Sequence, residues 1–455
     1  MPNMSTSIAI VLLAAFLAVS LPCEGRNNVA RVSRMFLESG GLEDKGTKWA
    51  VLVAGSNGYW NYRHQADICH AYQIMKRGGL KDENIIVFMY DDIARNSENP
   101  TPGIIINKPN GTDVYKGVPK DYTGNSTTAA NLYAVLLANK TGLSGGSGKV
   151  LESGPNDRVF FYYADHGAPG LLAMPVGDDV YATDLNRVFK TLHESNKYKS
   201  MVVYIEACES GSMVDGLLPN NIGIYATTAS NPNESSWGYY CDDSVYNTCL
   251  GDLYSIAWME DSDAHNSASE TLERQYKMVR ERTNLSHVMQ YGNMGMSQQY
   301  LATYVGKSEP IPSAVSSSEA LNLASIVSQR DADLLYYQRK VEKAREGSAE
   351  KVSAQRVLDE EIARRVKIDG HMESIAKGVL GERVDASNVA NALRPAGSPV
   401  VDDWDCFKST VGAYERHCGR LTSYGRKYTR VLANMCNNGA NAQKVESIII
   451  QACSA

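Results

Sequence analysis

Short apolar runs alternate with helix-periodic segments along the first two thirds of the chain. The runs are rich in β-branched and aromatic residues, which predicts buried strands. They lie at residues 49–54, 84–90, 158–163, 201–205 and 222–227. Helical spacing occurs at residues 63–77, 129–139, 183–193, 254–259 and 270–282. Strands that alternate with helices indicate an α/β fold, with a parallel sheet flanked by helices and right-handed crossovers.

The pattern changes after residue 306. Residues 307–333 contain Pro310, Pro312 and a run of serines at 316–318, which is typical of an exposed linker. Residues 334–455 are charged and helix-periodic, and they end in a segment with four cysteines. We therefore expect a catalytic or binding core over residues 47–306 and an all-α second domain, independent of the sheet.

The beginning of the chain predicts a leader. The apolar run at residues 8–21 is too short for a membrane span and is typical of a signal peptide, residues 1–25, cut after Gly25. Residues 1–7 contain no Lys or Arg, which is unusual for such a segment. Residues 26–46 are polar and pattern-poor. No later stretch is long and apolar enough to span a bilayer, so we expect no membrane span.

Five N-x-Ser/Thr sequons follow the predicted signal peptide and agree with entry into the secretory pathway. They are Asn110, Asn125, Asn139, Asn233 and Asn284. The nine cysteines agree as well, because Cys241 and Cys249 lie close together and four more cluster at the C-terminus. Cys23 would leave with the signal peptide, so Cys69 and Cys208 remain unpaired, and Cys69 falls in a helical pattern typical of the core.

The net charge of the chain bears on which kinds of partner it could bind. The 455-residue chain is 43% hydrophobic and carries a net charge of −6, which gives no reason to expect nucleic-acid binding. Residues 330–455 hold a small excess of basic residues, whereas residues 1–329 are acidic. The two parts could dock on each other, or both could simply be solvated surfaces.

Two reactive side chains follow neighbouring predicted strands. Cys208 comes after the strand at 201–205 and His166 after the strand at 158–163, so both lie at the carboxyl edge of the sheet. A cysteine nucleophile needs such a base, and the N–H groups of Gly167 and Cys208 could form an oxyanion hole.

Other interpretations of these residues are available. Cys208 could be a buried structural thiol and His166 a surface-loop histidine. A metal site is the weaker rival, since the histidines are dispersed and no C-x-x-C or H-x-x-x-H pattern occurs. A serine hydrolase is a third alternative, but its G-x-S-x-G pattern occurs only at residues 142–146, which do not follow a predicted strand.

Four motifs carry a resemblance to a known family. They are Asn61-Tyr-Arg-His-Gln-Ala66, Tyr163-Ala-Asp-His-Gly167, Glu206-Ala-Cys-Glu-Ser-Gly-Ser-Met213 and Glu234-Ser-Ser-Trp237. In this order they resemble the legumain family, and in particular its plant asparaginyl endopeptidases, from about residue 48 to the C-terminus. The resemblance implies a caspase-like core, with a parallel-dominated sheet flanked by helices, and no cofactor or metal.

The resemblance also implies roles for individual residues. Cys208 would be the nucleophile, His166 the proton shuttle and Asn61 the residue that orients this histidine. The S1 pocket, for the residue before the cleaved bond, would be built from Arg63, His64, Glu206, Ser235 and Asp252. A guanidinium and carboxylates suit an asparagine amide, and they would accept Asp only when it is protonated. Asp165 is either the family's succinimide-forming aspartate or a solvent-facing loop carboxylate.

The implied reaction is cleavage after Asn through a thioester, which water hydrolyses or a peptide amine converts into a new peptide bond. Gly238 after the Ser-Ser-Trp motif resembles hydrolases, whereas Ala168-Pro169 and the short loop between Cys241 and Cys249 resemble ligases. These signs conflict, so we expect a protease with substantial transpeptidase capacity. A non-catalytic secretory glycoprotein that binds through the same fold is the alternative.

The C-terminal region resembles the family's prodomain, which implies an intramolecular inhibitor over residues 334–455 and an N-terminal propeptide over residues 26–46. Its disulfides would be Cys406–Cys436 and Cys418–Cys453, with Cys241–Cys249 in the core. Asn322, Asp331 and Asp333 are candidate activation cleavage points. Acid would release the domain by protonating paired carboxylates whose pKa values are depressed. The implied substrates are peptides and proteins with exposed Asn or Asp, the compartment a vacuole or the cell exterior, and the zymogen could form a dimer.

Overall fold

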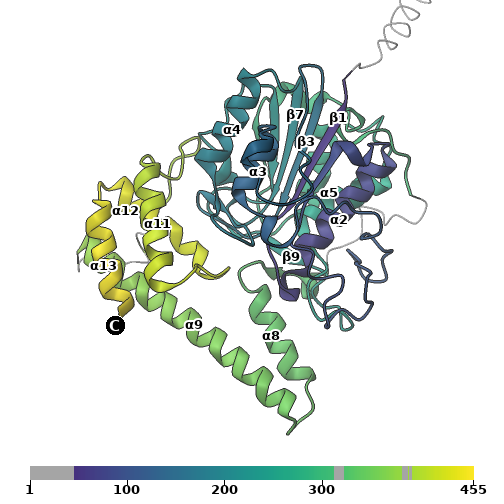
Figure 1. The fold of residues 1–455 in the computed structure, drawn as a ribbon. Helices are drawn as coiled ribbons and strands as arrows, with labels where there is room; N and C mark the ends of the chain where they lie inside the picture. The colour runs from purple at the N-terminus through teal and green to yellow at the C-terminus, as the bar shows by residue number, and fades with distance from the viewer. Residues whose placement is uncertain (1–45, 312–321, 382–387, 389–391, 455) are drawn as a thin grey trace, which may run out of the picture. The chain divides into compact units, whose positions relative to one another are not determined.

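A six-stranded sheet organises the core of the protein (Figure 1). Its order is β11 (Met289–Gly292), β8 (Ile224–Thr228), β7 (Ser200–Glu206), β3 (Arg158–Ala164), β1 (Lys48–Ala54) and β2 (Ile85–Phe88). The structure is a computed structural model that describes residues 46–311, 322–381, 388 and 392–454. The predicted signal peptide and almost all of the propeptide lie outside these residues.

The five predicted strands are all present and parallel, which confirms the α/β class. A sixth strand, β11, was not predicted from the sequence and pairs antiparallel with β8. Its sequence, Met-Gln-Tyr-Gly, lacks the β-branched run that marks the other strands. The sheet is therefore mixed, with one antiparallel edge strand.

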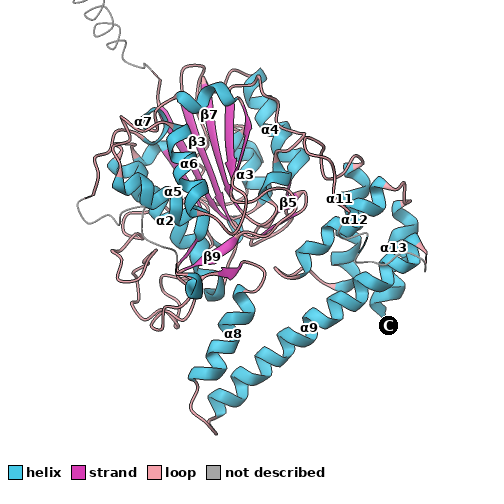
Figure 2. Cartoon of the chain, turned by 180° about the vertical axis from the view of Figure 1, so that it is seen from behind, coloured by secondary structure: helices cyan, strands magenta, loops and turns pink. Residues whose placement is uncertain are grey.

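Helices cover both faces of the sheet (Figures 1 and 2). One hydrophobic cluster joins alternate strand residues to α2 (Tyr62–Arg77) and α5 (Leu253–Ala264), with α6 (Leu272–Arg282) packed against α5. The other cluster contains α3 (Ala129–Leu136) and α4 (Ala182–Glu194). Because both faces are buried, the central strands are apolar at nearly every position rather than alternating.

Two small sheets lie beyond the carboxyl ends of the large sheet. One contains β4 (Gly167–Ala168), β5 (Leu171–Leu172) and β6 (Val180–Tyr181). The other contains β9 (Trp237–Tyr239), β10 (Gly251–Asp252) and β12 (Val327–Ser328). Since β12 comes from the predicted linker, the exposed-linker interpretation is wrong for this part, where hydrogen bonding to β9 outweighs a polar composition.

The C-terminal region is helical, as predicted. It contains α8 (Ala332–Lys343), α9 (Ala349–Leu380), α11 (Trp404–Cys418), α12 (Thr429–Asn437) and α13 (Ala442–Ser454). Disulfides join Cys406 to Cys436 and Cys418 to Cys453. A third disulfide, Cys241–Cys249, lies in the core, while Cys69 and Cys208 are free and buried.

The helical region is not independent of the sheet, contrary to the expectation from sequence. Ala168 and Leu171 of the core belong to the same hydrophobic cluster as Phe407 and Val431. The buried guanidinium of Arg426 donates two hydrogen bonds to Asp179, at 2.5 and 3.0 Å. Lys408 Nζ lies 2.7 Å from Asp184 Oδ1. The basic region therefore docks on the acidic one through ion pairs and an apolar contact.

None of the helices that the structure describes is both long and apolar enough to cross a lipid bilayer.

Candidate active site

The ends of β3 and β7 place the two candidate reactive side chains at the same level. The strands pair in parallel with Ala164 beside Glu206, and Asp165 N–H donates to Glu206 O at 3.0 Å. His166 and Cys208 each follow two residues after this last pair. Parallel pairing therefore explains why residues that are distant in sequence meet at one edge.

The backbone around Cys208 is tightly constrained. A Cβ atom on Gly167 would lie 2.1 Å from the carbonyl oxygen of Cys208, so no side chain can replace this glycine without a shift. Glu209 has a left-handed φ of 47°, which is uncommon for a residue other than glycine. Its N–H donates to Glu234 O at 2.7 Å, which holds the turn after the cysteine.

Asn61 forms a hydrogen bond with the ring of His166. Its Nδ2 donates to Asn57 O at 2.9 Å, and its Oδ1 lies 2.8 Å from His166 Nε2. Because Oδ1 can only accept, Nε2 carries the ring proton and Nδ1 is left as a base. Asn61 is the N-cap residue of α2, where an Asn side chain usually accepts a hydrogen bond from a backbone N–H of the first turn. It makes no such bond here, and its Oδ1 contacts His166 instead.

The electrostatic setting keeps both reactive groups neutral. Burial, and then the neighbouring His64, lower the pKa of His166 well below its ordinary value. Burial raises the pKa of the Cys208 thiol, and the guanidinium of Arg330 opposes this. The described form is thus latent, with a neutral thiol and a neutral imidazole.

A polar pocket lies beside these residues and is closed to solvent. Arg63 Nε donates to Asp252 Oδ1 at 2.9 Å, and both side chains are fully buried. Glu206 Oε2 accepts from both the N–H and the hydroxyl of Ser255 at 3.1 Å. Burial, and then the charge of Asp252, raise the pKa of Glu206 well above its ordinary value.

Gln329 occupies this pocket, and the sequence analysis missed it. Its Oε1 accepts from Arg63 Nη2 at 3.3 Å and lies 3.2 Å from His64 Nε2. Its Nε2 donates to Glu206 Oε1 at 3.2 Å. A carboxamide of the chain's own linker therefore fills the pocket predicted for a substrate's carboxamide. The apolar pair Ile326-Val327 before it, in a Ser-rich linker, is the sequence signal that could have indicated a strand there.

Other predicted pocket residues differ in how they contribute. His64 is fully buried, with Nδ1 2.6 Å from Ser56 Oγ, and burial lowers its pKa to about 3. Ser235 is only partly buried, whereas the buried Ser236 places its Oγ 4.0 Å from Cys208 Sγ. Ser236 is thus the serine of this motif that contacts the reactive group.

Asp165 is fully buried, so the solvent-facing alternative is wrong. Asp165 directly follows the buried strand β3, which ends at Ala164. Its Oδ1 lies 3.1 Å from His64 Nδ1. Burial raises the pKa of Asp165 to about 8. The ligand atoms of His64, Asp165 and His166 lie within 4.8 Å of one another, close enough for a metal ion. Ser56 and Gln329 contact the two ring nitrogens of His64, and Asn61 contacts Nε2 of His166.

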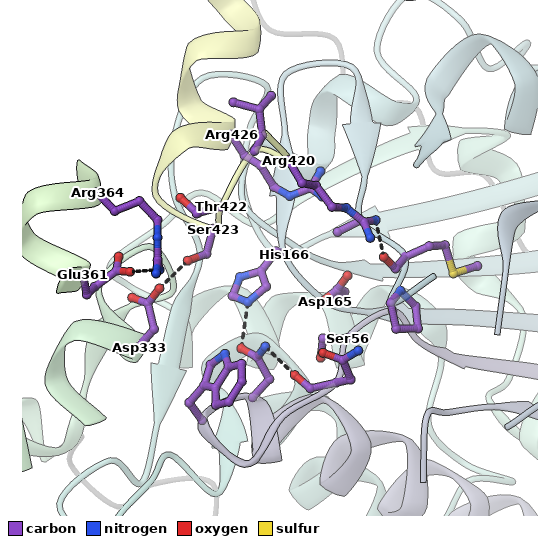
Figure 3. Close-up of a pocket in the computed structure, with 18 of the residues that line it drawn as sticks. Ser56, Asp165, His166, Asp333, Glu361, Arg364, Arg420, Thr422, Ser423 and Arg426 are labelled. Atoms are coloured by element: carbon purple, nitrogen blue, oxygen red, sulfur yellow. Dashed lines mark hydrogen bonds and ion pairs between the residues drawn. The ribbon is translucent and has the colours of Figure 1, made fainter. Parts of the chain in front are cut away.

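The C-terminal region covers the site. A cavity of about 320 Å³ lies over His166, lined on one side by core residues and on the other by Asp333, Arg364, Ser423 and Arg426 (Figure 3). Arg330 forms a buried ion pair with Glu209, next to Cys208. The tuning candidates Ala168 and Pro169 also lie under this cover, since Thr429 Oγ1 donates to Pro169 O at 3.1 Å.

The candidate cleavage points differ in accessibility. Asn322 is exposed, with its Nδ2 donating to Asp242 Oδ2 at 3.0 Å. Arg365 holds Asp331 at 2.7 Å and the buried Asp333 at 2.6 Å, so cleavage at either would require this contact to open. All five sequon asparagines are exposed.

Comparison with known proteins identifies the family to which the chain belongs. The peptidase C13 family matches residues 48–307, and the legumain prodomain matches residues 356–453. A vacuolar-processing enzyme of Vicia sativa is 50% identical over 99% of this chain and 96% of its own length. One from Citrus sinensis is 55% identical over 90% of this chain and 85% of its own, and a delta-isozyme from Arabidopsis thaliana is 52% identical over 92% of each.

The matched catalytic and inhibitory segments define the class, a cysteine endopeptidase made as a zymogen with its own prodomain. The chain belongs to the legumain family, peptidase C13. A caspase-1 from Spodoptera frugiperda also matches 58% of this chain and 93% of its own, with 13% identity and a TM-score of 0.33.

The buried Asp165 should make stability depend on pH. An ordinary Asp has a pKa of about 3.9, and the folded value is about 8. The native state thus keeps a proton that the unfolded state loses, so this contribution is present in acid and is lost as pH rises through 8. The free energy of unfolding should therefore decrease as pH rises toward 8. We expect Asp165→Asn to make this decrease less steep, by up to about 1.4 kcal/mol per pH unit.

Urea unfolding at several pH values, in a Cys208→Ala background, measures this slope. Asp178→Asn is the matched control, because Asp178 is exposed on the loop nearby. An Asp165→Asn slope equal to that of the parent would contradict the assignment.

Proposed function

We propose that the protein is an asparagine-specific cysteine endopeptidase that cleaves after Asn and, at acid pH, after Asp. The carboxamide of Gln329 is the observation that carries the proposal. It satisfies a donor of Arg63 and an acceptor of Glu206 at once, which a carboxamide can do and a simple cation or anion cannot.

The side chain of Gln is longer than that of Asn, and this difference in length can explain why Gln329 blocks the site while Asn is cleaved. Asn has one methylene fewer than Gln, which shortens it by about 1.5 Å. If the pocket holds the amide at the same atoms, Asn draws the backbone carbonyl carbon closer to the pocket. A displacement of about 1 Å can change the rate of a reaction roughly 100-fold. Gln329 therefore suits a resident blocker, and Asn suits cleavage.

The side chains support the following proton path. Cys208 gives its proton to His166 Nδ1, and the thiolate attacks the carbonyl carbon after Asn. The C–N bond breaks, the leaving amine takes the proton back from His166, and a thioester forms. The N–H groups of Gly167 and Cys208 are proposed to stabilise the oxyanion. Water or a peptide amine then attacks the thioester and releases Cys208.

The balance between hydrolysis and ligation depends on access to the thioester. We retain the expectation of substantial transpeptidase capacity, since Ala168-Pro169 and the short Cys241–Cys249 loop resemble ligases while Gly238 resembles hydrolases. The buried position of Ala168 and the contact at Pro169 mean that removal of the prodomain would uncover the segment. Peptide amines would then meet a partly apolar surface.

Peptides that differ only at one position test the proposal. We expect the acid-activated enzyme to cleave the Asn peptide and to leave the Gln peptide intact. The Asp peptide should be cleaved faster as pH falls toward about 4, because only the protonated acid offers both a donor and an acceptor. Mass spectrometry with an added amine peptide would reveal the ligated product.

Cys208→Ala is the control for the nucleophile. Equal product from this variant would rule out the mechanism, and linear product alone would rule out the ligase activity. Equal cleavage of Asn and Gln peptides would contradict the role of the pocket.

We also propose that acid releases the prodomain, and the structure narrows the groups involved. Glu209 does not follow the expected pattern of depressed pKa values, because burial raises its pKa more than Arg330 lowers it. A raised value favours the docked state in acid, so Glu209 opposes release. The ion pairs that would have to open on release join Asp179 to Arg426 and Arg420, and Asp184 to Lys408.

Asp179→Asn should make the prodomain easier to release. The change leaves the buried Arg426 charge without its ion-pair partner, which typically costs about 3–5 kcal/mol. We expect the variant zymogen to self-activate at a higher pH than the parent, measured as the pH at which hydrolysis of an Asn peptide appears. Glu360→Gln is the control, because its partner Arg356 is exposed on α9. An unchanged activation pH, or a parent that stays intact near pH 4–5, would contradict this route.

The compartment is proposed from the relatives, which are named vacuolar-processing enzymes. We propose transport through the secretory pathway to a vacuole, where acid would activate the zymogen and where proteins with exposed Asn or Asp are the substrates. The exposed sequons support passage through that pathway.

A further inference from the structure

The linker segment lies in the site as an extended peptide. In β12, Val327 pairs with Gly238 and Ser328 with Trp237, antiparallel to β9. Gln329 N–H donates to Ser236 O at 3.1 Å, and Cys241 N–H donates to Ser325 O at 2.8 Å. Residues 325–329 thus follow β9 in the manner of an added strand, a common way for proteins to hold a peptide.

Alternation along the strand separates the side chains. Gln329 and Val327 point to one side and Ser328 to the other, since the period of a strand is two residues. Val327 is therefore the next side chain, two residues before Gln329, that faces the same way as the occupant of the amide pocket.

Val327 packs against the Cys241–Cys249 disulfide. The half-buried Val327 contacts the cluster of Cys241, Cys249 and Ala332. Both cysteines are almost fully buried, at 1% and 3% exposure. Ala332 belongs to α8 in the C-terminal region, so the disulfide is the part of this contact that the catalytic core supplies.

Gly238 connects the disulfide to the amide pocket. A Cβ atom at this position would lie 3.2 Å from Cys249 Sγ, 3.4 Å from Cys241 Sγ and 3.6 Å from Arg63 Cδ. The bare backbone of Gly238 thus leaves a space that is bordered by both the disulfide and the aliphatic part of Arg63. The two pockets share this glycine as a wall.

We propose that the Cys241–Cys249 disulfide forms the base of a second specificity pocket, for the substrate side chain two residues before the cleaved Asn. The pocket takes a compact aliphatic side chain such as Val and rejects a charged one, because sulfur and aliphatic carbon offer no partner to a buried charge. This inference rests on the proposed function, because that function identifies Asn as the residue before the cleaved bond. The contact between Val327 and the disulfide is observed independently of it.

Peptides with Asn before the cleaved bond test this pocket in the acid-activated enzyme. The position two residues earlier carries Val, its isostere Thr, or Asp. We expect kcat/KM to fall several-fold from Val to Thr and at least tenfold from Val to Asp. The Cys241→Ala/Cys249→Ala variant should bring the ratio of Val to Asp close to one and keep the preference for Asn over Gln. The same substitutions at the position immediately before Asn are the matched control, and the double variant should not change their ratios.

A second measurement does not depend on cleavage after Asn. Arg330 is buried while the linker segment is docked, so cutting by trypsin after Arg330 reports undocking. In a Cys208→Ala zymogen we expect Val327→Asp to speed this cut several-fold and Val327→Thr to have a smaller effect. Ser328→Thr, whose side chain points the other way, should leave the rate unchanged.

The outcomes separate the two proposals. No preference for Val in the parent, or a preference that survives loss of the disulfide, overturns this pocket. An unchanged trypsin rate for Val327→Asp overturns it as well. Failure to cleave any Asn peptide, with the trypsin result as expected, overturns the proposed function and leaves this pocket standing.

Discussion

The charge of Arg63, fully buried at the carboxyl edge of the sheet, is the constraint on which the site depends. A buried guanidinium is tolerated only with partners in good geometry. Asp252 supplies the ion pair at 2.9 Å, and the carbonyl of Trp60 accepts a further hydrogen bond. One cation cannot offset all the acids around it, so burial and mutual repulsion raise the pKa values of Glu206 and Asp67. The same cation and the same burial keep His64 neutral.

Specificity and latency follow from the same requirement. Nη2 of Arg63 and Oε1 of Glu206 need a partner that both accepts and donates, and Gln329 is such a partner in the zymogen. An unpaired buried polar group costs about 1–3 kcal/mol. The linker segment that fills the pocket therefore also stabilises it, and under the proposed function a substrate side chain would replace these hydrogen bonds when the linker leaves.

The sequence predicted those parts that depend on local patterns. Five strands followed from apolar runs such as residues 49–54 and 201–205, and parallel topology brought His166 and Cys208 to one edge before any contact was known. The strand β12 was missed, because the apolar pair Ile326-Val327 is a short signal and Val327-Ser328 forms a strand by pairing with β9. The burial of Asp165 depends on which loop covers it. The docking of the helices depends on pairs such as Asp179 and Arg426, which are 247 residues apart.

The strand β9 is only three residues long, yet it lies next to the candidate nucleophile, the amide pocket and the linker segment. The residue before it, Ser236, approaches Cys208, Gly238 lies against Arg63, and its outer edge receives the linker. The disulfide lies close to Gly238, because a Cβ atom there would be 3.2 Å from Cys249 Sγ and 3.4 Å from Cys241 Sγ, which is tight. A larger residue at position 238 must therefore displace either the disulfide or the arginine. Because the first change alters the pocket around Val327 and the second alters the amide pocket, substitutions at this one glycine should couple the choice of substrate to the fate of the acyl-enzyme.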